Sequence, residues 1–199
     1  MLTVPSVYWG NIFYWSSLFK AEKVWIDEGE YFIKQTYRNR AEIATERGVA
    51  SLIIPLEKGK NTHMPMHEVR ISYAENWRAL HFKTLQSAYG RSAYFEHYKP
   101  ELAQLFSQQP EFLCDWNRSW FHFFANEFML DVSKIHFTKN YIETAEAGND
   151  IREKMNPKQK INFSHQAYYH VFFDKYPPVQ NLSVMDLLMN EGPAGMGIL

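Results

Sequence analysis

Two short basic clusters carry the residue types best suited to holding an anion. The first is the run 37–40, Tyr-Arg-Asn-Arg, and the second is Asn76-Trp77-Arg78 with His81 one helical turn later. A guanidinium presents a rigid fork of N–H donors that fits carboxylates and phosphates, and it keeps its charge at physiological pH. Two such clusters in a chain of net charge −1 predict a local site for a small anionic ligand.

The first cluster lies on an expected strand, where alternate side chains point to opposite faces. Arg38 and Arg40 then share one face and could clamp a phosphate or a carboxylate. The same pattern also fits an exposed strand face on which the arginines pair with Glu42 or Glu46. Asn39 points the other way and needs a hydrogen-bond partner if it is buried. We predict Arg38, Asn39 and Arg40 as substrate-binding residues, with the ion-paired exposed face as the alternative.

The second cluster combines a stacking surface with polar groups. Trp77 could stack on a ligand ring while Arg78 and His81 contact its polar groups, with Asn76 beside them. The alternative is a core tryptophan packed beside a core histidine. Asp27 follows a short apolar run and is a common type of binding carboxylate, although a plain turn residue would look the same. We predict His81 as the acid–base residue, Asp27 as its orienting partner, and Asn76, Trp77 and Arg78 as binding residues.

Metal and cofactor sites are not predicted. His63 and His67 have a spacing that suits zinc on a helix, but Pro65 lies between them and argues against a helix. Cys114 lies among aromatic residues, where a buried and inert thiol is expected. The glycine-rich nucleotide-binding loops and the nucleophile elbow of hydrolases are absent from the sequence.

Length and composition limit the class of protein. A chain of 199 residues with 46% hydrophobic and 17% aromatic residues can form one domain, residues 1–199, with a sizeable core. The near-neutral charge argues against nucleic acid as a partner. The sequence has no signal-like start and no apolar run long enough to cross a bilayer, and a single cysteine fits a reducing compartment. We therefore expect a cytoplasmic protein; its oligomeric state does not follow from the sequence.

The sequence pattern favours an α/β or α+β fold, with a small mixed sheet from the N-terminal half, packed helices, and a helix-rich C-terminal half. The Arg38/Arg40 face and the helix 72–89 would line one cleft. A polar segment rich in turn residues, 144–160, is the candidate mobile loop. The expected elements are an extended segment 2–8, a helix 12–20, a strand 24–26, a hairpin 31–56 turning at 47–48, helices 72–89, 101–108 and 110–130, a strand 135–138 and a helix 184–190.

Five short motifs in order resemble the WbqC-like protein family. They are Val-Trp-Ile-Asp at 24–27, Tyr-Arg-Asn-Arg at 37–40, Asn-Trp-Arg-x-x-His-x-Lys-Thr at 76–84, Ala-Tyr-Phe at 93–95 and the closing segment 182–193. The chain departs from that family near its start. Members carry a His-Gln-Pro-x-Tyr-x-Pro-like stretch, whereas residues 4–10 here read Val-Pro-Ser-Val-Tyr-Trp-Gly. The chain also looks like a short, divergent member.

The resemblance implies a transferase of surface-polysaccharide (O-antigen) synthesis that binds an anionic activated donor such as a sugar nucleotide. The missing histidine motif keeps an alternative open. In that alternative the chain is a non-catalytic ligand- or partner-binding module.

Overall fold

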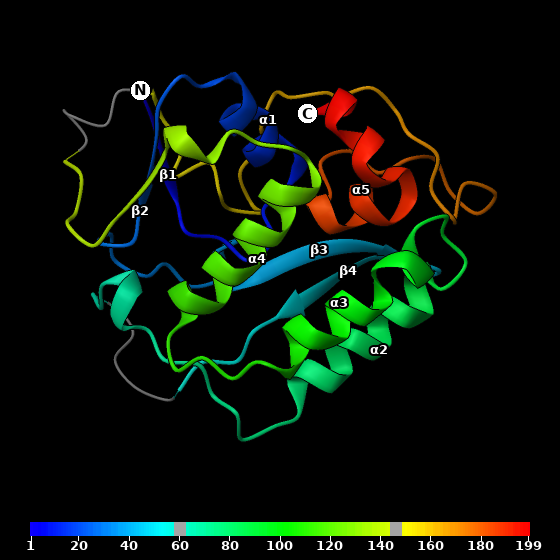
Figure 1. The fold of residues 1–199 in the computed structure, drawn as a ribbon, viewed down its shortest axis with the longest axis horizontal. Coiled ribbons are helices and arrows are strands. Elements are labelled where there is room, and N and C mark those ends of the chain that lie inside the picture. The colour runs from blue at the N-terminus through cyan, green and yellow to red at the C-terminus, as the bar shows by residue number, and fades with distance from the viewer. Residues whose placement is uncertain (58–62, 144–148) are drawn as a thin grey trace.

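The computed structural model describes residues 1–57, 63–143 and 149–199, and their strands form two separate sheets (Figure 1). The four-stranded sheet is parallel, in the order β5-β2-β1-β6, and the other is an antiparallel hairpin of β3 and β4. The α/β class is confirmed. The strands, however, are divided between two sheets, and two of them come from the second half of the chain. The strands are β1 (Leu2–Pro5), β2 (Val24–Asp27), β3 (Arg40–Thr45), β4 (Gly48–Ile53), β5 (Ile135–Thr138) and β6 (Asn149–Asp150).

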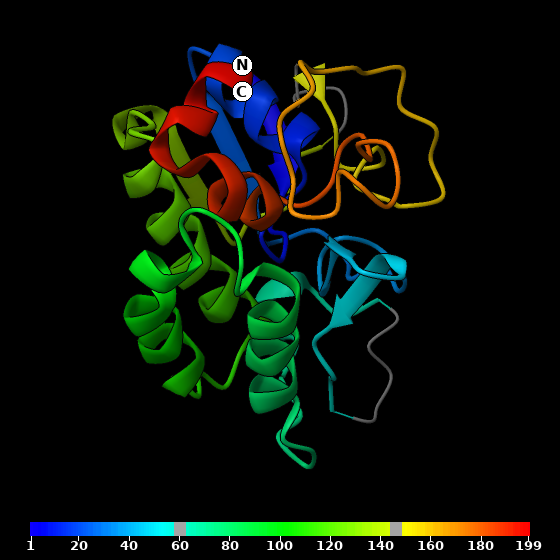
Figure 2. The ribbon, with the colours of Figure 1, turned by 90° about the vertical axis from the view of Figure 1, so that its right-hand side faces the viewer.

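Helices cover much of the molecule. Figure 2 shows the green helices along one side and the irregular segment 151–182, in yellow to orange, along the other. None of the helices within the described residues is both long and apolar enough to cross a membrane. The α-helices are α1 (Ile12–Lys20), α2 (Trp77–Tyr89), α3 (Phe95–Ser107), α4 (Leu113–Glu127) and α5 (Val184–Glu191), with 3-10 turns η1 (Met66–Glu68), η2 (Val132–Lys134) and η4 (Gly192–Ile198).

The β1-α1-β2 unit begins the fold much as the sequence predicts. Asn11 caps α1 by accepting a hydrogen bond from the Tyr14 amide at 2.9 Å, which satisfies one of the free N–H groups of the first turn. Pro5 ends β1 and does not keep this strand from a central position in the sheet, between β2 and β6. On its β6 side β1 pairs only through Leu2 and Thr3, so the proline at its end disrupts no bond there.

The hairpin forms around the predicted turn, but its first arm is shorter than expected. Residues 32–39 form a compact connection, and β3 begins only at Arg40. Within that connection the Thr36 hydroxyl donates to the Ile33 carbonyl at 2.7 Å, which replaces ladder pairing with a local turn. Arg38 and Arg40 therefore do not lie on one face of a common strand.

Helix α2 begins later than expected, and it turns His81 rather than Leu80 toward the core. Asn76 is its N-cap and accepts from the Ala79 amide, so the helix begins at Trp77 rather than at residue 72. Leu80 is 62% exposed whereas His81 is 3% exposed. The aromatic contact between Trp77 and Trp116, with ring centroids 5.1 Å apart, fixes which side of α2 faces the core.

The later helices keep their predicted places with shifted ends. Helix α3 begins at Phe95 rather than at residue 101, and it contains Pro100. Helix α4 begins at Leu113 rather than at Pro110. Ser183 occupies the N-cap position of α5, but its hydroxyl makes no capping hydrogen bond among the described residues.

The expected mobile loop 144–160 is only partly described. Residues 144–148 lie outside the described residues, whereas 149–150 form β6 beside β1. Ile151, Arg152 and Met155 are buried. Through these three side chains, the part of the segment next to β6 packs into the fold.

Candidate functional site

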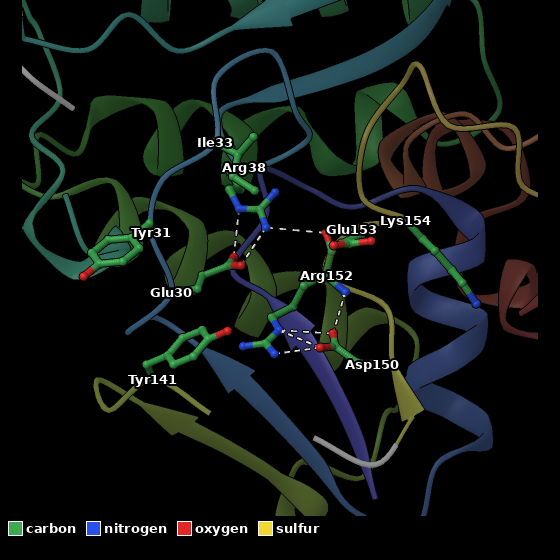
Figure 3. A pocket seen from close by; sticks show the side chains of 9 residues that line it. All are labelled: Glu30, Tyr31, Ile33, Arg38, Tyr141, Asp150, Arg152, Glu153 and Lys154. Atoms are coloured by element: carbon green, nitrogen blue, oxygen red, sulfur yellow. Dashed lines mark hydrogen bonds and ion pairs between the residues drawn. The ribbon is translucent and has the colours of Figure 1, made fainter. Parts of the chain in front are cut away.

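A cavity of about 560 Å³ opens at the carboxyl ends of the parallel strands. In open parallel sheets, ligands bind outside these ends, where neighbouring strands connect in opposite directions. Strand β1 meets that description, because the chain continues from it to β2 on one side and returns much later as β6 on the other. The cavity is lined by Glu30, Tyr31, Ile33, Arg38, Tyr141, Asp150, Arg152, Glu153 and Lys154 (Figure 3).

Arg152 connects the ends of two strands beneath the cavity. Its Nη1 donates to Asp27, the last residue of β2, at 2.5 Å, and to the Ile142 carbonyl at 2.9 Å. Its Nη2 donates to Asp150, the last residue of β6, at 2.6 Å. Asp27 also accepts from the amides of Gly29 and Glu30. This one guanidinium therefore ties β6 to the turn after β2 and fixes the cavity floor.

Arg38 forms the second ion pair of the floor. Its Nε and Nη2 donate to the two carboxylate oxygens of Glu30, at 2.8 and 2.7 Å, in the forked geometry that guanidinium and carboxylate favour. Its Nη1 donates to Thr36, and Nη2 also reaches the Arg152 carbonyl at 3.4 Å. Because Arg38 is only 1% exposed, its charge needs this partner to be tolerated at that depth.

Burial and pairing act in opposite directions on the carboxylates of the floor. Burial raises the pKa of Glu30, and the neighbouring Arg38 acts against that rise. Burial acts to raise the pKa of Asp150 as well, but hydrogen bonds from Arg152 outweigh it and the net pKa is lowered. Burial acts to lower the pKa of Arg152, and its bonds to Asp150 and Asp27 more than reverse this. The Asp150–Arg152 pair is therefore ionised at neutral pH.

The rim of the cavity is more exposed and differs between its two sides. Tyr31 and Tyr141, 57% and 48% exposed, lie on one side of the ion pairs in Figure 3, and Glu153 and Lys154 lie on the other. The Arg152 guanidinium stacks under the Tyr141 ring at 5.0 Å from its centroid.

Gly29 explains how Tyr141 reaches this place. A Cβ atom on Gly29 would lie 2.5 Å from the Lys139 carbonyl oxygen, so only glycine lets the segment before Tyr141 pass so close to the turn after β2.

The structure brings one of the predicted binding residues to this cavity and leaves the others elsewhere. Arg38 lines it. Asn39 instead donates to the Ile54 carbonyl at 2.9 Å, the kind of partner expected for a partly buried amide. Arg40 opens β3 and has its Nε buried with no hydrogen-bond partner among the described residues. The exposed-face alternative is also wrong for Arg38, since its glutamate partner is buried with it.

The second cluster forms part of the packed interior. Trp77 and His81 are 4% and 3% exposed, and their rings contact each other at 5.1 Å. The Tyr8 hydroxyl lies 3.2 Å from His81 Nδ1, and burial lowers the pKa of His81 to about 4, although a hydrogen bond with the backbone of Ile53 acts against this. The histidine is neutral at physiological pH.

The remaining predicted residues, Arg78, Asn76 and Asp27, form hydrogen bonds within the fold at the ends of helices or of strand β2. Arg78 Nη1 donates to the last carbonyls of α3, at Phe106, Ser107 and Gln108. Asn76 caps α2. Asp27 was expected to orient His81, but its bonding partners are Arg152 and nearby amides instead. Arg38 and α2 do not line a common cleft among the described residues. Asn76 and Arg78 instead line a separate cavity of about 340 Å³ between α2 and α3.

The sequence interpretation missed Glu30, Asp150 and Arg152. One local signal was present, because Asp27, Glu28 and Glu30 place three carboxylates directly after a buried strand, at the edge where ligands bind. Arg152 had no such signal, since it lies in a polar segment 114 residues beyond Arg38.

The match to known proteins gives the family. The model of the WbqC-like protein family matches residues 6–136, which is well over half of the chain, and the chain belongs to this family. The match begins at Ser6, so Val4 and Pro5 of the divergent start lie before it. Neither a search of curated proteins nor a search of solved structures finds a match.

Proposed function

We propose that this chain is a transferase of surface-polysaccharide (O-antigen) synthesis that binds an anionic activated donor, such as a sugar nucleotide, in the cavity at the carboxyl edge of the parallel sheet. The observation that carries the proposal is a cavity of about 560 Å³ with Lys154 in its wall, a cation that has no ion-pair partner among the described residues. That volume suits a small organic ligand. Family membership supports the proposal through the association of the WbqC-like family with surface glycans.

The rim residues suggest how such a donor is held. Lys154 has no ion-pair partner among the described residues, so its charge is available to a phosphate. Tyr31 and Tyr141 offer exposed ring faces to a base or a sugar. Glu153 is the lining carboxylate without an ion-pair partner among the described residues, and we assign it the role of general base. The acid–base role predicted for His81 stays a prediction, and its buried position does not support it.

Binding of the donor is testable with the intact protein. In titration calorimetry against UDP-, GDP- and CMP-linked sugars, at least one should bind, and the Lys154→Ala variant should weaken that binding about five-fold or more, because one charge-assisted contact is lost. Lys83→Ala is the matched control, an exposed lysine on α2 away from the cavity. The proposal fails if no sugar nucleotide binds, or if both lysine variants bind like the wild type.

A second candidate is a non-catalytic ligand- or partner-binding module. The observation that favours it is the sealed position of His81 together with valine at position 4, in the stretch where family members carry histidine. Under this function the donor would bind and be recovered intact after prolonged incubation, whereas a transferase hydrolyses its donor slowly even without an acceptor. Chromatography of the recovered donor distinguishes the two.

A further inference from the structure

The two arginines of the cavity floor are already engaged, and this changes what the floor can bind. Arg38 is held by both oxygens of Glu30, and Arg152 is held by Asp150 and Asp27. Each pair is buried or nearly so; the side chains of Arg38, Glu30 and Arg152 are 1%, 6% and 6% exposed. A free phosphate clamp would need at least one guanidinium without a carboxylate partner.

The remaining hydrogen-bonding capacity of each pair is mixed. A guanidinium has five N–H donors and a carboxylate about four acceptor positions. The bonds of Arg38 to Glu30, Thr36 and the Arg152 carbonyl leave an N–H on Nη1, and Glu30 keeps a lone pair on each oxygen. Asp150 accepts from three N–H groups of Arg152, its amide, Nε and Nη2, which leaves about one acceptor position, and Arg152 keeps one N–H on Nη2. Each pair therefore keeps both a donor and an acceptor. A hydroxyl group both donates and accepts and can use both, whereas an ionised phosphate can only accept.

Charge leads to the same conclusion. The lining residues contain Glu30, Asp150 and Glu153 against Arg38, Arg152 and Lys154, so acids and bases are equal in number. A phosphate placed on the floor would lie against two carboxylates in a partly desolvated setting, where like charges are costly. A neutral polyhydroxylated ring meets no such penalty.

We propose that the two ion pairs of the floor bind vicinal hydroxyls of a sugar ring, and that the phosphates of the donor lie away from the floor, toward Lys154. This rests on the proposed function and adds the orientation of the ligand to it. The tyrosine side of the rim in Figure 3 then packs against the ring system, and the Lys154 side holds the anionic part. Asp150 is a residue that determines specificity, because it supplies an acceptor at the more open end of the floor, with a side chain 21% exposed.

Vicinal hydroxyls occur both on the transferred sugar and on the ribose of a nucleotide. Four probes separate these sources: UDP-glucose carries both, UDP carries only the ribose, glucose carries only the sugar, and inorganic pyrophosphate carries neither. Each would be titrated calorimetrically into the wild type and the Asp150→Asn variant, with Asp174→Asn as the control at an exposed position away from the cavity.

The expected result is that Asp150→Asn weakens UDP-glucose at least five-fold and leaves pyrophosphate unchanged, while Asp174→Asn changes neither. A loss for UDP-glucose without a loss for UDP assigns the floor to the transferred sugar, and an equal loss for both assigns it to the ribose. Whether Asp150→Asn weakens or tightens binding distinguishes hydroxyls on the floor from phosphate on the floor. If phosphate lay on the floor, removing a carboxylate would tighten pyrophosphate and UDP-glucose, and that outcome overturns the inference.

A wild-type measurement covers the case in which the variant does not fold. Pyrophosphate should bind at least 100-fold more weakly than UDP-glucose, and equal binding of the two would overturn the inference while leaving donor binding intact. If glucose binds and Asp150→Asn weakens it, but no sugar nucleotide binds, the proposed function fails and the hydroxyl assignment stands. If none of the four probes binds and no GDP- or CMP-linked sugar binds either, both are wrong.

Discussion

The cavity floor and the core side of α2 contain similar residue types and use them in opposite ways. At the floor, Arg38 and Arg152 keep their charges beside a cavity of about 560 Å³ because carboxylates lie within hydrogen-bond distance. On α2, Trp77 and His81 pack among aromatic rings, and the histidine is neutral. Both regions were expected to form one site, yet they are separate parts of the molecule.

The difference follows from what each side chain requires once water is removed. A guanidinium cannot become neutral, so burying it requires a carboxylate, and the pair brings polar capacity to any adjoining cavity. An imidazole can lose its proton and then be packed like an aromatic residue. Basic residues read from a sequence therefore indicate a polar site more reliably when they are arginine than when they are histidine.

The largest expected effect is a loss of stability when the buried ion pair of the cavity floor is broken. Arg38→Ala leaves Glu30 buried without its partner and should lower the free energy of unfolding by about 3–5 kcal/mol. Urea denaturation followed by circular dichroism measures it. Arg70→Ala, which breaks the much more exposed pair with Glu111, should cost at most about 1 kcal/mol.

Equal effects of the two substitutions would contradict the description of the floor. They would mean that Glu30 and Arg38 are solvated, and the argument that their charges are already neutralised would then fail.

How much could be predicted from the sequence depended on how local the signal was. The helix 12–20 and the strand 24–26 lie close together in the chain, and both were predicted nearly to the residue. The hairpin turn was also predicted, and Gly48 adopts a φ of 101° there, which suits glycine. Caps, short apolar runs and turns act over a few residues, so the sequence displays them directly.

The site depended on contacts that the sequence does not display. Arg38 was predicted to bind, but which acid it meets is decided by how the connection 32–39 folds back. On α2, Leu80 is more hydrophobic than its neighbour His81, so hydropathy alone would place Leu80 in the core. The position of Trp116 on a distant helix decided otherwise, and Leu80 is exposed. Family resemblance could not identify Arg152 as a site residue either, because the family match ends at residue 136.

The second effect uses pH to probe the α2 region. The pKa of His81 is about 4 in the folded protein and about 6.5 when unfolded, because burial disfavours its charged form. Below pH 6.5 the His81 side chain of the unfolded chain is protonated, whereas in the folded protein it stays neutral until about pH 4. The contribution of His81 to stability is therefore full above pH 6.5 and lost as pH falls to 4, by about 3 kcal/mol.

Urea titrations across this range with the wild type and His81→Gln would measure the effect. The difference in unfolding free energy between the two proteins should shrink as the pH falls. His97→Gln, at an exposed position on α3, should follow the wild type at every pH. A constant difference between wild type and His81→Gln would show that His81 titrates normally, and its assignment to the sealed core would be wrong.

The smallest expected effect concerns the rim and depends on a donor that binds. Tyr141→Ala removes an exposed ring that lies over Arg152 and should weaken sugar-nucleotide binding about five-fold, while changing stability little, since the ring is 48% exposed. Tyr169→Ala is the matched control, because Tyr169 is 64% exposed and stacks on Phe173 outside the cavity. If both variants bind the donor like the wild type, the tyrosine side of the rim makes no contact with the ligand. The aromatic rings would then stabilise the fold at α2 but bind no ligand at the cavity. The cavity would differ from the α2 region in its ion pairs alone.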